Sequence, residues 1–275
     1  MKDILEWIRD EKQVEVLQRK MELPVEAMHH ALAKKPRRDV RSLSGALRAS
    51  RTGIIAEFKR KSPSKGWIAP DALVSDIVPK YEQNGASACS VLGDKHFFGG
   101  SMEDVRRARQ TTSRVPILYK EFIVDEYQVY EARMIGADAI LLIAALLSKE
   151  DCRAWAKLAN SLGLEVLLEI HNLEELDCLH EHVQVLGVNN RNLRTFETGL
   201  SEAEKRAKVI QNRLAGMERP PVLISESGLK DAQTIRQLRQ MGYEGFLIGE
   251  YFMRQVSPAD ELRELIHTLE NGEAR

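Results

Sequence analysis

Eight short apolar runs, separated by amphipathic segments, follow one another along most of the chain. Each run has the length of a β-strand and is rich in branched aliphatic residues. The runs show too little polar alternation for a sheet with one face in water, so they predict strands buried on both faces, as in a parallel sheet. They cover residues 53–59, 88–92, 115–120, 139–143, 164–170, 185–189, 221–226 and 245–249.

The segments between the runs carry helix signals. Ser148 precedes acidic residues and is typical of the N-cap of a helix, which stops at Gly163. Pro79 weakens the same interpretation for residues 70–84. Eight strands, each followed by a helix, predict an α/β fold of the (β/α)8 TIM barrel type. A doubly wound sheet fits less well, because no Gly-x-Gly-x-x-Gly sequence follows the first run. Further helices are expected at residues 124–136, 201–212, 230–241 and 257–270.

The first 50 residues predict helices instead, because apolar residues recur there at helical spacing among charges. Pro24 interrupts the first helix, and two shorter helical patterns follow it. Such short amphipathic helices have too little apolar surface to fold alone. We therefore expect one barrel domain over residues 1–275, in which residues 1–48 form an N-terminal helical extension that covers the barrel or its mouth. The apolar stripe of the first helix consists of Ile4, Trp7, Ile8, Val14 and Leu17.

The balance of charge excludes several classes of function. The chain has 40 Lys and Arg against 41 Asp and Glu, so it has no basic excess with which to bind nucleic acid. The longest apolar stretch, residues 139–147, is about half a membrane span, and the charged N-terminus does not resemble a signal peptide. The cysteines show no Cys-x-x-Cys spacing, so we expect free thiols in a cytoplasmic protein. They are Cys89, Cys152 and Cys178.

Charged and amide residues stand at the ends of five of the predicted strands. Active sites of such barrels lie at the carboxyl ends of the strands, where these side chains would converge. One charged strand end is usually structural, whereas five that converge predict a site with two lysines and at least three carboxylates, suited to acid–base chemistry. The strand ends are Glu57-Phe58-Lys59, Lys120-Glu121, Glu169, Asn189-Asn190-Arg191 and Ser225-Glu226-Ser227-Gly228.

Glycines after the last two runs indicate a phosphate site. Ser227-Gly228 and Gly249-Glu250 place backbone N–H groups where barrels of this type bind phosphate, which predicts a small phosphorylated substrate. Phe97 and Phe98 fit the core as well, but beside two glycines they more closely resemble loop aromatics over a planar ligand. His180 and His182 are expected to diverge on a helix surface, and no residue set has the spacing of a zinc site, so no metal is predicted.

Several segments, in this order and spacing, resemble the indole-3-glycerol-phosphate synthase family over nearly the whole chain. The first is Ile55-Ala56-Glu57-Phe58-Lys59-Arg60-Lys61-Ser62-Pro63-Ser64-Lys65-Gly66, followed by Ser90-Val91-Leu92 and Phe97-Phe98-Gly99-Gly100-Ser101. The others are Lys120-Glu121-Phe122-Ile123-Val124-Asp125, residues 136–143, Leu168-Glu169-Ile170-His171, Asn189-Asn190-Arg191-Asn192-Leu193, Ser225-Glu226-Ser227-Gly228 and Ile248-Gly249-Glu250.

The resemblance implies a lyase of tryptophan biosynthesis that converts 1-(2-carboxyphenylamino)-1-deoxyribulose 5-phosphate to indole-3-glycerol phosphate, CO₂ and water, without a cofactor. It implies that Lys120 is the general acid at the carbonyl, that Lys59 pairs with the substrate carboxylate, and that Glu169 serves the dehydration. Glu57 and Asn189 would hold the lysines and the departing hydroxyl, and Ser227 completes the catalytic set. Substrate binding is assigned to Arg191, Glu226, Phe98, Phe122 and Leu92, and phosphate binding to Lys61, Ser62, Gly228, Gly249 and Glu250.

The chain departs from the family pattern at a few positions, and two other functions stay open. Glu121 stands where the family usually has Asp, Gly93 where it commonly has Thr, and Tyr251 and Phe252 are bulkier than usual. One alternative is another phosphosugar enzyme such as an isomerase, which gives no reason for two lysines. The other is a non-catalytic relative that binds a phosphorylated metabolite or a partner subunit. The resemblance also allows association with other enzymes of the tryptophan pathway.

Overall fold

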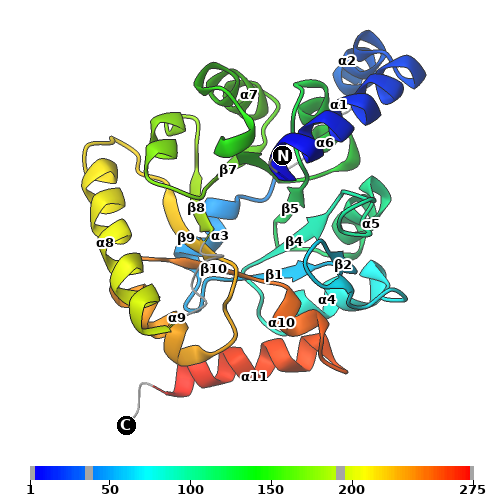
Figure 1. Cartoon of the computed structure of the whole chain (residues 1–275). Helices are drawn as coiled ribbons and strands as arrows, with labels where there is room; N and C mark the ends of the chain where they lie inside the picture. The colour runs from blue at the N-terminus through cyan, green and yellow to red at the C-terminus, as the bar shows by residue number, and fades with distance from the viewer. Residues whose placement is uncertain (1–3, 35–39, 190–195, 273–275) are drawn as a thin grey trace.

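A computed structural model describes residues 4–34, 40–189 and 196–272. Eight parallel strands form a closed barrel in the order β1-β10-β9-β8-β7-β6-β5-β4 (Figure 1). Each predicted run contains one of these strands, which confirms the eight runs and the (β/α)8 barrel. The strands are β1 Ile54–Phe58, β4 Ala88–Leu92, β5 Ile117–Lys120, β6 Ala139–Ile143, β7 Glu165–Ile170, β8 Val185–Asn189, β9 Val222–Glu226 and β10 Gly245–Ile248.

Helices surround the barrel, and most begin and end where the sequence predicts. The Ser148 hydroxyl accepts a hydrogen bond from the Asp151 amide at the start of α7, and Gly136, with φ 96°, ends α6. Helix α4 continues through Pro79, and α8 begins before the predicted Ser201. The helices after the first strand are α4 Val74–Gln83, α5 Met102–Thr111, α6 Tyr127–Ile135, α7 Lys149–Ser161, α8 Phe196–Leu214, α9 Ala232–Gln240, α10 Glu250–Met253 and α11 Pro258–Asn271.

The prediction that a helix follows every strand is wrong at β7. Only a short 3₁₀ turn, η2 Glu174–Cys178, follows this strand, whereas a second such turn, η1 Ala144–Leu146, precedes α7. His180 and His182 therefore lie in a loop rather than on a helix, with ring centroids 5.8 Å apart. Within the described ranges, no three His, Cys, Asp or Glu side chains are grouped so that they could hold a metal ion.

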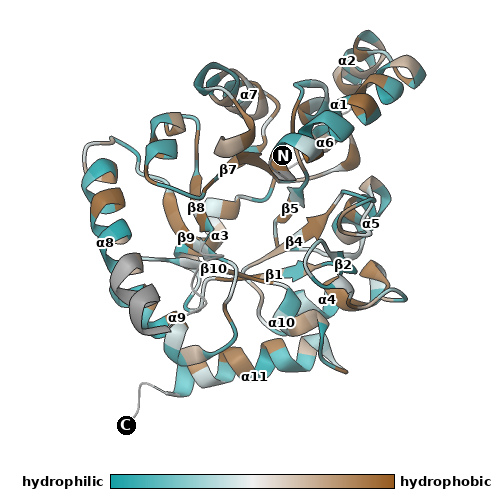
Figure 2. Ribbon diagram, in the orientation of Figure 1, coloured by the Kyte–Doolittle hydropathy of each residue, from teal (hydrophilic) through white to brown (hydrophobic). Residues whose placement is uncertain are grey.

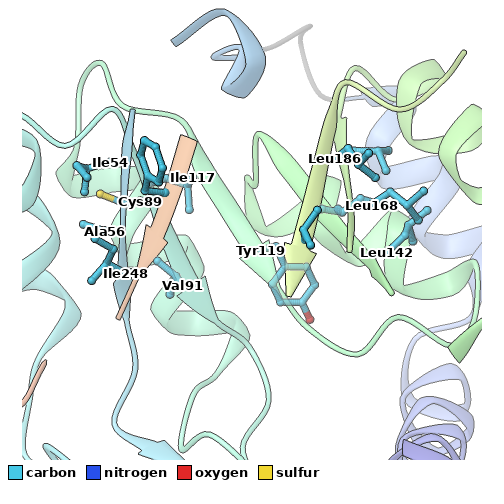
Figure 3. Packing of buried hydrophobic residues seen from close by; sticks show 14 of the residues in the cluster. Ile54, Ala56, Cys89, Val91, Ile117, Tyr119, Leu142, Leu168, Leu186 and Ile248 are labelled. Atoms are coloured by element: carbon cyan, nitrogen blue, oxygen red, sulfur yellow. The ribbon is translucent and has the colours of Figure 1, made fainter. Parts of the chain in front are cut away.

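Strand residues alternate between two apolar layers. Ile54, Ala56 and Phe58 point outward and pack with the surrounding helices, and Figure 3 shows part of this layer beside β1 and β7. Ile55, Leu118 and Ile224 belong to the second cluster, which fills the barrel interior. The strands are accordingly apolar, while the surrounding helices alternate between apolar and polar residues (Figure 2). All three cysteines are buried and free, as predicted.

The N-terminal segment contributes three helices, α1 Ile4–Glu22, α2 Val25–Lys34 and α3 Leu43–Ala49. Helix α3 contributes Leu43 and Leu47 to the interior cluster, and the hydroxyl of Ser42 donates to Glu165 at the start of β7. It therefore closes the end of the barrel at which the strands begin. Helix α2 packs against α6 (Figure 1). In the described segments, no helix is both long enough and apolar enough to span a membrane.

Helix α1 lies against the opposite end of the barrel. Its buried face consists of Ile8, Lys12 and Val16. Ile8 of the predicted apolar stripe is buried, but Trp7, Val14 and Leu17 are exposed, so the stripe coincides only in part with the buried face of this helix.

Candidate active site

Four charged side chains belong to the inward-facing rows of alternate barrel strands. Because strand side chains alternate, Glu57 shares the inward face of β1 with Ile55, and Lys120 that of β5 with Leu118. Glu169 follows Leu167 on β7, and Glu226 follows Ile224 on β9, in the same way. The interior of the barrel is thus charged at the carboxyl ends of the strands and apolar beneath this charged layer, toward the ends at which the strands begin.

Lys120 lies at the centre of this charged layer. Its ammonium nitrogen is 2.5 Å from Glu226 Oε2, 3.6 Å from Glu169 Oε2 and 4.0 Å from Glu57 Oε2. The Lys59 ammonium lies 3.0 Å from Glu57 Oε1. The predicted strand-end residues therefore come together in one cluster of two lysines and three carboxylates.

Amide and hydroxyl groups fix the orientation of two of the carboxylates. The Asn189 side-chain amide donates to Glu169 Oε1 over 2.8 Å. The Ser90 hydroxyl, on the neighbouring strand β4, donates to Glu57 Oε2 over 3.3 Å. Sequence reasoning missed Ser90, although its inward position on the second run would have indicated it.

Two glycines make room for the carboxylates. A Cβ atom at Gly187 would lie 2.1 Å from Glu226 Oε1, and one at Gly249 would lie 2.5 Å from Glu57 Oε1. Any larger residue would therefore displace the side chains that surround Lys120. Gly249, predicted from a phosphate-site pattern, thus also has a packing role.

The charges of the cluster shift one another's pKa values. Burial alone would lower the pKa of Lys120, but Glu226, Glu169 and Glu57 raise it above its ordinary value, so the lysine is protonated. Burial and the neighbouring carboxylates raise the pKa of Glu226 to about 7, against the attraction of Lys120. Burial opposes charge on Glu57 as well, but Lys59 and Lys120 hold its pKa below the usual range. The cluster therefore contains a proton donor and a carboxylate that titrates near neutrality.

His171 extends the cluster away from Lys120. Its Nε2 lies 3.3 Å from Glu169 Oε1, and its backbone amide donates to Glu175 Oε2 over 2.7 Å. The hydrogen bond to Glu175 and the charge of Glu169 raise the pKa of His171, although its burial opposes this. Sequence reasoning assigned His171 no role.

Aromatic rings stand beside the cluster on the loops after β4 and β5. The ring centroids of Phe98 and Phe122 are 5.8 Å apart. Leu92 is the last residue of β4 and precedes the loop that carries Phe98. Phe97 is buried and packs edge-on against Trp7 of α1, at 5.1 Å. Phe97 is therefore a core residue, which is the other alternative that the sequence left open, and the N-terminal extension packs against it; Phe98 remains partly exposed.

The predicted phosphate residues are divided between two loops. The Ser62 hydroxyl is buried and has no hydrogen-bond partner among the described residues, whereas the Lys61 ammonium donates to the His96 carbonyl over 2.7 Å. They belong to a small hairpin, β2 Lys61–Ser62 and β3 Gly66–Trp67.

The other predicted phosphate residues follow β9 and β10. Ser227 and Gly228 both have positive φ values, 71° and 75°, in the turn after β9. Gly249 precedes the short helix α10, whose first residue, Glu250, pairs with Arg254. Arg191, predicted to bind the substrate, lies outside the described residues.

The departures from the family pattern have structural partners. Glu121 lies 3.2 Å from the Lys12 ammonium of α1. A Cβ atom at Gly93 would lie 2.2 Å from the Tyr119 ring, which explains why this position is glycine here. The Tyr251 hydroxyl bonds to Glu261 of α11, and Phe252 is buried, so both pack α10 rather than enter the charged cluster.

Comparison with known proteins agrees with this geometry. The family model described as Indole-3-glycerol phosphate synthase matches residues 5–265. The chain belongs to the indole-3-glycerol phosphate synthase family. A relative of that name from Bacteroides thetaiotaomicron is 46% identical over 271 residues, which cover 98% of this chain and 100% of the relative. A second, from Chromobacterium violaceum, is 41% identical over 272 residues, covering 96% and 98%. The predicted family is thus confirmed.

Solved structures share the fold at low sequence identity. The tryptophan synthase α-subunit of Pyrococcus furiosus has a TM-score of 0.57 and 14% identity, covering 80% of this chain and 98% of its own. The 3-hexulose-6-phosphate synthase of Salmonella typhimurium has a TM-score of 0.57 and 13% identity, covering 79% and 98%. At this identity the likeness supports the barrel fold alone.

Proposed function

We propose that the charged cluster at the barrel mouth catalyses the conversion of 1-(2-carboxyphenylamino)-1-deoxyribulose 5-phosphate to indole-3-glycerol phosphate, CO₂ and water. The observation that carries the proposal is the environment of Lys120, a protonated lysine among three carboxylates with Lys59 beside it. The reaction needs a proton donor at a carbonyl, a cation at a carboxylate, and an acid–base group for dehydration. The cluster supplies one group of each kind.

Ring closure is the step assigned to Lys120. The aromatic carbon that bears the carboxylate attacks the sugar carbonyl, and a C–C bond forms while the carbonyl oxygen gains negative charge. Lys120 donates its proton to this oxygen, which becomes a hydroxyl. A positioned general acid of this kind contributes roughly 10²- to 10⁴-fold to a rate. Loss of CO₂ then returns the bonding electrons to the ring.

Lys59 is assigned to the substrate carboxylate. An ammonium beside the carboxylate orients the aromatic ring for attack and neutralises its charge until CO₂ leaves. Glu57 Oε1 lies 3.0 Å from the Lys59 ammonium and holds it in place. Lys59 can also share the proton donation, since both lysines approach Glu57.

Dehydration is assigned to Glu169. The departing hydroxyl needs a proton and the substrate nitrogen loses one, so a single carboxyl group can serve both transfers in turn. Asn189 holds Glu169 Oε1, and burial of Glu169 is offset by Lys120 and His171, which keep its pKa below the usual range. Glu169 is therefore ionised first and acts as the base before it acts as the acid.

The ends of the substrate are assigned to the flanking loops. Phe98, Phe122 and Leu92 would contact the aromatic ring, and Glu226 and Arg191 complete the substrate-binding set that the resemblance implies. The free hydroxyl of Ser62 and the backbone N–H groups near Gly228 are suited to the phosphate. Lys61, Gly249 and Glu250 complete this assignment, and Ser227 completes the catalytic set.

One assay tests the proposal against the two alternatives. The purified protein is mixed with the carboxyphenylamino-deoxyribulose phosphate in EDTA, and indole fluorescence and released CO₂ are followed together. We expect one CO₂ for each indole product, and activity in EDTA because the cluster supplies every proposed acid and base. An isomerase would change the sugar without releasing CO₂, and a binding protein would release nothing. Either result would contradict the proposal, as would activity restored only by a divalent metal.

We further propose that the protein works in the cytoplasm as a single barrel domain, with residues 1–48 as its extension. Three buried free cysteines support a reducing compartment, and the near-zero net charge argues against nucleic acid as a partner. Association with other enzymes of the tryptophan pathway would pass this phosphorylated product to the next reaction. Co-sedimentation of the purified enzymes tests the association.

A further inference from the structure

A lysine of the N-terminal extension is buried against the loops of the proposed site. The Lys12 side chain on α1 is only 1% exposed and lies one turn from Ile8 and from Val16 on the buried face of the helix. Burial of a charged ammonium costs free energy unless carboxylates compensate the charge. The carboxylates around Lys12 therefore show which parts of the protein this lysine interacts with.

Three carboxylates surround the Lys12 ammonium. Asp94 Oδ2 lies at 2.6 Å, Glu15 Oε2 at 2.7 Å and Glu121 Oε1 at 3.2 Å. Glu15 belongs to the same helix, whereas Asp94 follows β4 and Glu121 follows β5. Lys12 thus joins the two loops that carry the aromatic rings of the proposed site.

Each of the two loop carboxylates also holds backbone amides of an aromatic residue. Asp94 Oδ1 accepts from the Phe97 amide at 2.5 Å and from the Phe98 amide at 3.3 Å. Glu121 Oε1 accepts from the Phe122 amide at 2.8 Å. The rings of Phe98 and Phe122 stand 5.8 Å apart, so the two carboxylates together set the spacing of this pair.

We infer that Lys12 is a positioning residue for the aromatic end of the substrate, because its ammonium holds Asp94 and Glu121 in place and they in turn fix Phe98 and Phe122. The inference rests on the proposed function for the identity of the ligand. Without the ammonium, two buried carboxylates would lose the cation that contacts both of them. One would then take up a proton or turn away, and its loop would lose the amide contacts that orient the ring.

Burial and the neighbouring charges support this reading. Burial alone would lower the pKa of Lys12, yet Glu121 and Asp94 raise it, so the side chain remains charged. Burial raises the pKa of Glu121, and Lys12 is the first group that opposes this. Removal of Lys12 would therefore favour protonation of Glu121.

The test separates the two ends of the site with fragment inhibitors. Anthranilate reports on the aromatic end and glycerol 3-phosphate on the phosphate end. For Lys12→Met we expect the KM of the substrate and the Ki of anthranilate to rise about tenfold or more, as misplaced contacts do, with the Ki of glycerol 3-phosphate unchanged. Lys12→Arg should bring KM and the anthranilate Ki most of the way back to the wild-type values, because it restores the positive charge.

Lys20→Met is the matched control. Lys20 lies on the same helix and pairs with Asp125 at 2.7 Å, but both side chains are about one-third exposed and neither contacts Asp94 or Glu121. We expect this variant to keep the kinetic constants and both Ki values of the wild type.

Three results would overturn the inference. If Lys12→Met lowers thermal stability but leaves KM and both Ki values unchanged, Lys12 only anchors the structure. Equal changes in both Ki values would show a general distortion of the mouth. If Lys12→Met does not fold, Glu121→Met decides, because it removes the oxygen that accepts from the Phe122 amide, and an unchanged anthranilate Ki in that variant would refute the inference. Calorimetry with the fragments reads these effects even if the wild type fails to turn over the substrate, which would contradict only the proposed function.

Discussion

Replacement of Lys120 by Met removes one ammonium from the centre of the charged cluster and little else. Methionine is unbranched and of similar length, so it can follow the same path among the inward-facing side chains of the barrel. The Lys120 side chain is 16% exposed, and its nearest partner, Glu226, lies at 2.5 Å. The substitution therefore tests the charge and the proton of Lys120 rather than the packing of β5.

The expected loss follows from the geometry. If Lys120 is the general acid, kcat should fall by roughly 10²- to 10⁴-fold, which corresponds to roughly 2.7–5.5 kcal/mol of transition-state stabilisation. Lys59 cannot replace it fully, because its ammonium is held by Glu57 Oε1 on the other side of that carboxylate. KM should change less, since the phosphate and the substrate carboxylate are assigned to other residues.

The pH dependence should change in a defined direction. Lys120 lowers the pKa of the neighbouring carboxylates, so its removal should raise the pKa of Glu169, the proposed base, and that of Glu226 as well. The acid limb of the kcat profile should then move to higher pH. The buried carboxylates can take up protons when the ammonium is gone, which limits the loss of stability.

Steady-state kinetics with indole fluorescence measures these effects. Lys149→Met is the control, because this exposed lysine pairs with Asp177 at the surface and its loss should leave kcat unchanged. Lys120→Arg should not restore activity, since a guanidinium does not release its proton. A kcat near the wild-type value in Lys120→Met would refute the mechanism.

Three further predictions follow from other parts of the molecule. Gly187→Ala should lower kcat strongly, because the added Cβ would displace Glu226. Gly216→Ala is the control and should keep the wild-type kcat, because its added Cβ would lie no closer than 3.7 Å to a neighbouring atom. Equal kcat values in the two variants would contradict the claim that Gly187 makes room for Glu226. Glu175 and Glu169 raise the pKa of His171, so the charge it contributes stabilises the fold at acidic pH and is lost as the pH rises. The difference in Tm between the wild type and His171→Asn should therefore be largest at about pH 5 and smallest at about pH 8. A Tm difference that grows with pH would contradict the stabilising role of the His171 charge. A chain that starts at Ser50 lacks Leu43 and Leu47 of the interior cluster and should lose both thermal stability and kcat; wild-type values of Tm, kcat and KM would show that the extension is dispensable.

Local sequence patterns were sufficient for the barrel and for most of its charged layer. A two-residue alternation assigns every residue of a strand to one face, so the ends of the apolar runs already placed Glu57, Lys120, Glu169 and Glu226 at one mouth. Short-range signals such as Ser148 and Gly136 fixed helix ends, because capping depends on a few neighbouring residues.

Tertiary contacts decided what these local patterns leave open. The sequence cannot tell that β7 is followed by a 3₁₀ turn, or that Phe97 packs beneath Trp7, because both depend on elements that are distant in the chain.

Helix α1 shows most directly what the sequence alone cannot decide. Of its predicted apolar stripe, Ile8 is buried but Trp7, Val14 and Leu17 are exposed, and the buried face contains Lys12. The reason is Asp94, 82 residues away, whose buried carboxylate requires a cation that only the folded chain brings to it.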